Sequence, residues 1–115
     1  MSAPIVFFDL AGPDEPVLRA FYEDVFGWPS GKPGNFTPGN APQLQGTIRQ
    51  DPAEKMLYLG VEDITATLEK VVAAGGAIDT PRFEVPGVVV LGLFKDPAGN
   101  RMGLVEMTGT APTIP

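Results

Sequence analysis

The sequence predicts an α+β fold in which two β-α-β-β-β units form a curved mixed sheet around a cleft. Two observations predict it. Strand-like and helix-like hydrophobic patterns occur in the same order in both halves of the chain. In addition, residues of the first predicted helix recur at a constant offset in the second, which indicates a repeated supersecondary unit. The corresponding pairs are Leu18 and Leu68, Phe21 and Val71, and Tyr22 and Val72.

The length of 115 residues predicts one domain over 1–115. Within it, we place unit one at about 4–52 and unit two at about 55–107. The Thr-, Gly- and Pro-rich end at 108–115 is expected to be a flexible tail.

The first unit begins with a strand at 5–10, bounded by Ala-Gly-Pro. Asp14 is a suitable N-cap for a helix that Gly27 ends. Gly, Pro and Asn dominate 29–42, which predicts loop or short hairpin strands, and 44–49 can form a strand. The apolar residues at helical spacing are Val17, Leu18, Phe21, Tyr22, Val25 and Phe26.

The second unit repeats this order. A strand at 56–61 precedes a helix that Asp63 caps and the Gly75-Gly76 pair ends. Residues 77–83 predict an edge strand, because Pro81 is tolerated only at edges or bulges. Two further strands are expected at 88–94 and 101–107. The apolar stripe of the helix is Ile64, Leu68, Val71 and Val72.

Composition excludes several kinds of chemistry. The chain has no His and no Cys, which excludes ordinary zinc sites, His-based iron sites, disulfides and Ser-His or Cys-His nucleophile pairs. The net charge of −6 disfavours nucleic acid as a partner. No apolar run is long enough to cross a membrane, and the first residues lack the pattern of a secretion signal. We therefore expect a cytoplasmic location.

Several motifs resemble the vicinal oxygen chelate superfamily, which includes glyoxalase I, bleomycin-resistance proteins and extradiol dioxygenases. The stretch at 21–28, FYEDVFGW, resembles the end of that superfamily's first helix. Residues 94–101, FKDPAGNR, are similar to its terminal Asp-Pro-x-Gly-Asn hairpin. The resemblance covers nearly the whole chain and is weakest at 29–55. It implies a glyoxalase-like fold and a homodimer.

The resemblance also implies where a metal would be bound. Family members with a metal carry His where this chain has Phe7, a second His near Met56, and Glu at Gly103. A fourth ligand would fall at Gln45 or Thr47. Three of these four positions are apolar or lack a side chain, so we expect no metal and no cofactor.

Strand alternation predicts which residues line the cleft. If Val6 and Phe8 pack under the first helix, then Phe7 and Asp9 face the opposite side. Asp9 is a candidate proton acceptor or the partner of an arginine such as Arg101. Trp28 could be a ligand wall or a packing residue, and Phe36 a lid. The candidate ligand-binding residues are Phe7, Asp9, Trp28, Phe36, Gln45, Thr47, Met56, Tyr58 and Arg101.

Three functions remain open. The first is metal-free binding of a small, partly apolar molecule, such as sequestration of a cationic drug in a resistance-type protein. The second is a metal-independent lyase or isomerase that uses Asp9, Tyr58 or Arg101. The third is a structural module for dimerisation with a collapsed cleft. Oxygen-only binding of Mg²⁺ or Ca²⁺ by Asp9, Glu84 and Glu106 is disfavoured, because these acids show no clustered spacing.

Overall fold

The computed structural model describes residues 2–28, 35–36 and 44–115. The chain divides into two compact units. The N-terminal unit is Val6–Leu57, and the C-terminal unit is Met1–Ile5 together with Tyr58–Pro115. The strand β4 (Glu54–Val61) contributes its first half to one unit and its second half to the other.

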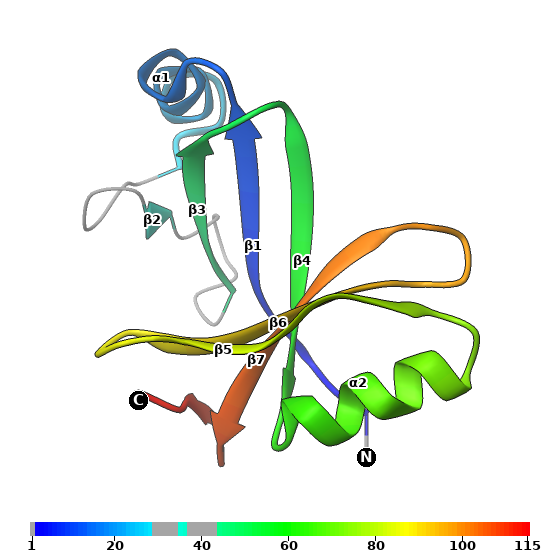
Figure 1. Ribbon diagram of the computed structural model, residues 1–115. Coiled ribbons are helices and arrows are strands. Elements are labelled where there is room, and N and C mark those ends of the chain that lie inside the picture. The colour runs from blue at the N-terminus through cyan, green and yellow to red at the C-terminus, as the bar shows by residue number, and fades with distance from the viewer. Residues whose placement is uncertain (1, 29–34, 37–43) are drawn as a thin grey trace. The chain divides into compact units, whose positions relative to one another are not determined.

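In the N-terminal unit, a sheet with the strand order β2-β3-β1-β4 accompanies one helix (Figure 1). Its elements are β1 (Ile5–Gly12), α1 (Glu15–Phe26), β2 (Asn35–Phe36) and β3 (Gln45–Gln50). β1 and β3 run parallel, with Phe7 opposite Gln45 and Asp9 opposite Thr47. This supplies the register that the loop-like composition of 29–55 left open.

Both ends of α1 are as predicted. The Asp14 carboxylate accepts a hydrogen bond from the Val17 backbone N–H at 3.3 Å. Gly27 ends the helix in the left-handed conformation, with φ of 65°. The predicted apolar stripe is only partly buried, however. Leu18 and Tyr22 are half-buried, whereas the remaining apolar side chains of the stripe are exposed: Val17, Phe21, Val25 and Phe26.

The C-terminal unit has the strand order β4-β7-β6-β5, with β8 paired to β7. Its elements are α2 (Ile64–Ala73), β5 (Ala77–Val85), β6 (Val89–Lys95), β7 (Arg101–Thr108) and β8 (Ala111–Pro112). β4 and β7 are parallel, and β6 is antiparallel to β5 and to β7. β5 is the edge strand predicted from Pro81, and its register shifts twice near that residue.

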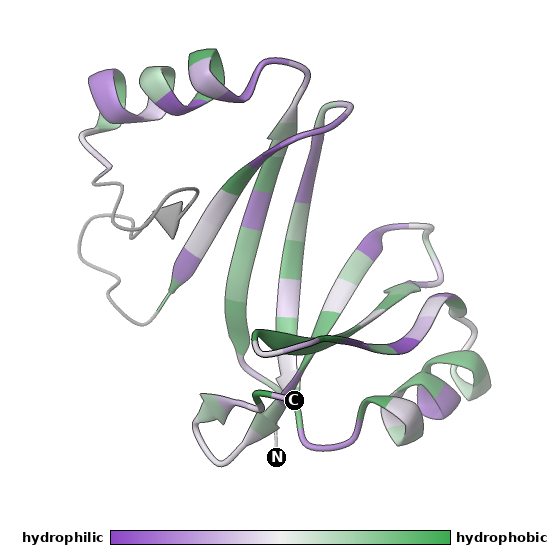
Figure 2. Ribbon diagram, turned by 60° about the vertical axis from the view of Figure 1, so that its left-hand side comes forward, coloured by the Kyte–Doolittle hydropathy of each residue, from purple (hydrophilic) through white to green (hydrophobic). Residues whose placement is uncertain are grey.

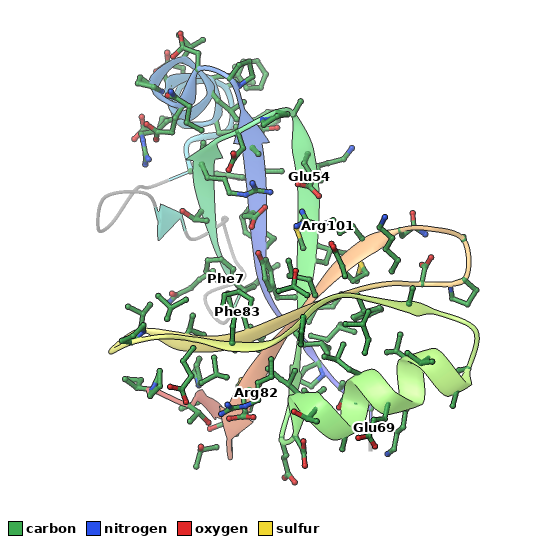
Figure 3. The ribbon with its side chains drawn as sticks, in the orientation of Figure 1. Phe7, Glu54, Glu69, Arg82, Phe83 and Arg101 are labelled. Atoms are coloured by element: carbon green, nitrogen blue, oxygen red, sulfur yellow. The ribbon has the colours of Figure 1, made fainter. Side chains whose placement is uncertain are left out.

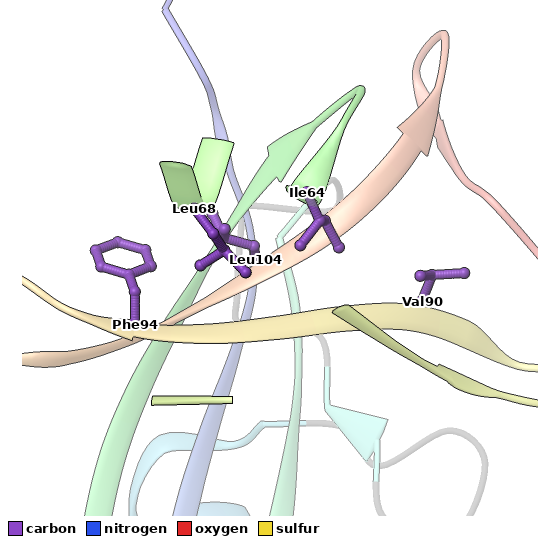
Figure 4. Close-up of a cluster of buried hydrophobic side chains, with 5 residues drawn as sticks. All are labelled: Ile64, Leu68, Val90, Phe94 and Leu104. Atoms are coloured by element: carbon purple, nitrogen blue, oxygen red, sulfur yellow. The ribbon is translucent and has the colours of Figure 1, made fainter. Parts of the chain in front are cut away.

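The main hydrophobic core of this unit lies between α2 and one face of the sheet (Figure 4). Asp63 caps α2 by accepting from the Ala66 N–H at 2.9 Å. Gly92 is required beneath the helix, because a Cβ there would lie 2.6 Å from Ile64 Cγ2. Val72, predicted to lie in the buried stripe, is instead exposed. The core residues are Ile64, Leu68, Val90, Phe94 and Leu104.

The C-terminal segment, for which the sequence predicts flexibility, forms hydrogen bonds with β7. Met107 pairs with Pro112 and Thr108 with Ala111. The Thr113 N–H also donates to the Glu106 carbonyl at 2.9 Å. The α+β fold class is thus confirmed, and no helix among the described residues is long and apolar enough to span a bilayer.

Candidate functional site

The two faces of the N-terminal sheet differ in character. Phe8 lies on the α1 side, where its ring makes an edge contact with the Trp28 ring at a centroid distance of 5.8 Å. Strand alternation then places Phe7 and Asp9 on the other face. We call this the site face, and it carries Phe7 and Asp9 from β1, Thr47 and Arg49 from β3, and Glu54 and Met56 from β4.

Arg49 on β3 forms ion pairs with carboxylates of β1 and β4 on the site face. Its Nε lies 3.2 Å from Asp9 Oδ1. Its Nη1 donates to Asp51 at 2.7 Å, and its Nη2 donates to Glu54 at 2.8 Å. Burial lowers the pKa of Arg49, but hydrogen bonds to Glu54 and Asp51 and the charge of Asp9 outweigh that effect and raise it. Three carboxylates surround one guanidinium, so the cluster has a formal net charge of −2.

Asp9 has an arginine partner, as one of the sequence alternatives expected. Asp9 is buried, at 3% exposed, and forms an ion pair with Arg49. Arg101 donates from Nε to Asp79 at 2.6 Å in the C-terminal unit. Asp79 on β5 is therefore a carboxylate that Arg101 binds, which the strand pattern of β7 alone did not indicate.

Apolar residues share the site face with this charged cluster. Met56 is almost fully buried and lies two residues from Glu54 on β4, so both side chains lie on one face. Phe7 is half-buried on β1 (Figure 3). Thr47 is half-buried and Gln45 is exposed on the neighbouring strand. Phe7, Asp9, Gln45, Thr47 and Met56, which are among the predicted ligand residues of this unit, thus share one face that combines apolar, polar and charged groups.

Trp28 is engaged in packing. Its ring stacks on Tyr22 at a centroid distance of 4.9 Å and meets Phe8 at its edge. These contacts fix the chain where it leaves α1. The side chain of Phe36 lies outside the described residues, although its backbone pairs with Gly46.

Tyr58 and Gly103 form a cross-strand pair in the C-terminal unit. A Cβ at Gly103 would lie 2.2 Å from Tyr58 Cδ2, so the tyrosine ring already fills that space. Tyr58 is 9% exposed. A larger residue at 103 therefore requires that this ring move.

This arrangement does not fit a transition metal. The resemblance places ligands at Phe7, Met56 and Gly103, where the chain has an aromatic ring, a buried thioether and no side chain. The Tyr58 ring also occupies the space in which a carboxylate at 103 would begin. Among the residues that the structure describes, no group of three or more Asp and Glu is placed to hold an ion.

Arg49 and Glu54 were not among the candidates from the sequence. One signal could have identified Arg49, because it follows Thr47 at the alternate position of the same predicted strand. Glu54 precedes Met56 in the same way on β4. Their partnership across the β3–β4 turn depends on tertiary structure.

Comparison with known proteins shows the family. A family model described as glyoxalase-like domain matches residues 5–105. A curated protein of Mycobacterium tuberculosis, named "Putative glyoxylase CFP32", is 28% identical, with 84% of this chain covered. Its counterpart in Mycobacterium bovis gives the same values. The chain spans only 42% of the length of these relatives.

Solved structures share the fold at low identity. A glyoxalase/bleomycin resistance protein/dioxygenase superfamily member from Vibrio splendidus has a TM-score of 0.64 at 15% identity, covering 92% of this chain and 100% of its own. The Mn(II)-bound glyoxalase from Novosphingobium aromaticivorans has a TM-score of 0.60 at 19% identity, covering 98% of this chain and 42% of its own. These structures show that the fold is shared, and the family match shows that this chain belongs to the glyoxalase-like domain family, in agreement with its resemblance to the vicinal oxygen chelate superfamily.

Proposed function

We propose that this protein binds a small, partly apolar molecule without a metal ion. The observation that carries the proposal is the chemistry at the positions where the resemblance expects ligands. Phe7, Met56 and Gly103 supply no carboxylate or imidazole, and the whole chain contains no His or Cys. Binding must then depend on shape, burial and the remaining polar groups.

The site face supports a ligand with both apolar and cationic parts. The half-buried Phe7 offers apolar contact surface, which suits aromatic or aliphatic groups. Three carboxylates, those of Asp9, Asp51 and Glu54, lie around Arg49. A ligand that pairs an aromatic group with an amine would complement both features.

The test is a thermal-shift screen of aromatic amines, aromatic acids and neutral aromatics, each with and without EDTA. We expect aromatic amines to raise the melting temperature in a saturable manner, and EDTA to leave the shift unchanged. Phe7→Ala should weaken the response, whereas Leu57→Ala, an exposed apolar residue on β4, should not. Stabilisation by Zn²⁺, Ni²⁺ or Fe²⁺ alone would refute the proposal.

A metal-independent lyase or isomerase is the second candidate, and one observation favours it. Asp9 is a buried carboxylate beside a guanidinium on the site face, where it could exchange a proton with a bound substrate. Turnover that Asp9→Asn abolishes while ligand binding and folding survive would favour this candidate. Binding without turnover would favour sequestration.

We also propose that two copies associate, and that the protein acts in the cytoplasm. The proposal of a homodimer rests on the resemblance to the vicinal oxygen chelate superfamily, whose members of this size commonly form homodimers. The absence of Cys is compatible with a reducing compartment. Sedimentation equilibrium measures the association, and a monomer at all accessible concentrations would contradict it.

A further inference from the structure

Helix α1 turns a strip of large apolar side chains toward solvent. Val17, Phe21 and Val25 are spaced by four residues and therefore lie in one row along the helix. Together with Phe26 they form the α1 strip, whose members are 50–64% exposed. No residue of α1 is buried, whereas α2 buries two of its residues completely or nearly so. Hydrophobic and hydrophilic segments alternate along the α1 ribbon (Figure 2).

Helix α1 is acidic, and part of its negative charge lies beside the α1 strip. The helix and its cap contain four acids and one arginine, for a formal net charge of −3. The one arginine, Arg19, is hydrogen-bonded to Glu15. Asp24 is exposed and lies beside the apolar row, three residues after Phe21. The strip is thus an apolar row with an acidic border.

We propose that the α1 strip is a docking surface for a basic amphipathic helix of a partner protein, a role beyond ligand binding. The apolar row would pack against residues at positions i, i+3 and i+4 of such a helix. Lysines or arginines beside that apolar face would meet Asp24 and Asp14. A second copy of this chain fits less well, because two α1 helices in contact would bring their acidic borders together.

The test uses a synthetic peptide of leucine and lysine, about 18 residues long with helical apolar spacing, and a matched peptide with glutamate in place of lysine. Trp28 is the only tryptophan, and its ring centroid lies 6.4 Å from that of Phe26. Its fluorescence therefore reports on the end of the strip. We expect a saturable change with the lysine peptide and none with the glutamate peptide.

Two pairs of variants locate the binding. Val25→Ser should weaken lysine-peptide binding about tenfold, while Val88→Ser should not change it. Val88 is 60% exposed in the C-terminal unit and is thus the matched apolar control. Asp24→Lys should also weaken binding, whereas Glu69→Lys on the exposed side of α2 should not.

Two results would overturn the proposal. If Asp24→Lys and Glu69→Lys weaken peptide binding equally, binding depends only on the net charge of the protein. The second result has two parts: the original protein does not bind the peptide, and Val25→Ser changes the oligomeric state. This result would identify a second copy of the chain as the occupant of the α1 strip. Circular dichroism of each variant tests whether α1 remains folded. If Asp24→Lys unfolds the helix, Asp24→Asn is used in its place.

Discussion

At the scale of single residues, two positions require glycine because a neighbouring aromatic ring occupies the space that a side chain would take. Gly46 lies beneath the Phe8 ring in the N-terminal unit, and Gly103 lies beneath the Tyr58 ring in the C-terminal unit. In each case the aromatic residue and the glycine are register partners on adjacent parallel strands. The rings cover backbone that a side chain would otherwise cover, so neither glycine is exchangeable for an ordinary strand residue.

Gly103→Ala should destabilise the protein by about 1–3 kcal/mol, because the new Cβ would overlap the Tyr58 ring. The cost should fall to less than about 1 kcal/mol in a Tyr58→Ala background, where the ring is absent. Urea denaturation of the four proteins of this double-mutant cycle measures the coupling. Equal costs in both backgrounds would show that the ring does not fill this space.

Arg49→Met should lower the free energy of unfolding by about 2–4 kcal/mol, because it removes the guanidinium beside the buried Asp9 carboxylate. Arg82→Met is the matched control, since Arg82 is more exposed than Arg49 and its carboxylate partners Glu84 and Glu106 are less buried than Asp9. That control should cost less than about 1 kcal/mol. Denaturant melts of both variants measure the difference, and similar losses would contradict the importance of the Arg49 cluster.

At the scale of elements, the two helices differ in how their apolar residues are used. α2 places Ile64 and Leu68 in a continuous core, whereas α1 is held by half-buried residues and by ring contacts at its C-terminal end. The stability of the C-terminal unit should therefore depend on the start of α2.

Asp63→Ala should destabilise the protein by about 1 kcal/mol, because the Ala66 N–H loses its acceptor at the first turn of α2. Asp63→Asn retains a side-chain oxygen at the same position and should recover most of that loss. Thermal and urea denaturation measure both variants. A full loss in the asparagine variant would mean that charge, rather than capping, carries the effect.

The contact between β5 and β7 predicts sensitivity to acid. Arg82 donates two hydrogen bonds to Glu106, which lower the pKa of Glu106 below its ordinary value of 4.5 although burial opposes the shift. A carboxyl group with a lowered pKa in the folded state stabilises the protein above its ordinary pKa. That contribution is lost as the pH falls below about 4.5 and through the lower folded value.

The melting temperature should therefore fall between about pH 5 and pH 3, and Glu106→Gln should show a shallower fall together with lower stability at pH 7. Glu69→Gln is the control, because Glu69 is an exposed acid on α2. Calorimetry across this pH range measures all three proteins. If the melting temperature of Glu106→Gln falls with decreasing pH as steeply as that of the original protein, the Arg82–Glu106 pair is not the source of the acid sensitivity.

At the scale of the whole molecule, local patterns predicted the elements well. Asp14, Asp63 and Gly27 mark helix ends through short-range hydrogen bonds and backbone conformation, which a sequence shows directly. Pro81 likewise identified β5 as an edge strand. Alternation also assigned Phe7 and Asp9 to the face opposite α1.

Side-chain partners and helix burial were less predictable. Asp9 binds Arg49, forty residues along the chain, because β1 and β3 lie side by side in a register that composition could not fix. The exposure of Phe21 and Val25 likewise depends on which face of α1 meets the sheet. Periodicity identifies an apolar stripe, but it does not say how much of the stripe is covered.

The most direct test of the central claim is the dissociation constant of the best aromatic amine from the screen, measured by titration calorimetry first in EDTA and then with added Mn²⁺. Metal-independent binding predicts the same constant, within about twofold, in both conditions. Binding that disappears in EDTA and returns with Mn²⁺ would contradict the account.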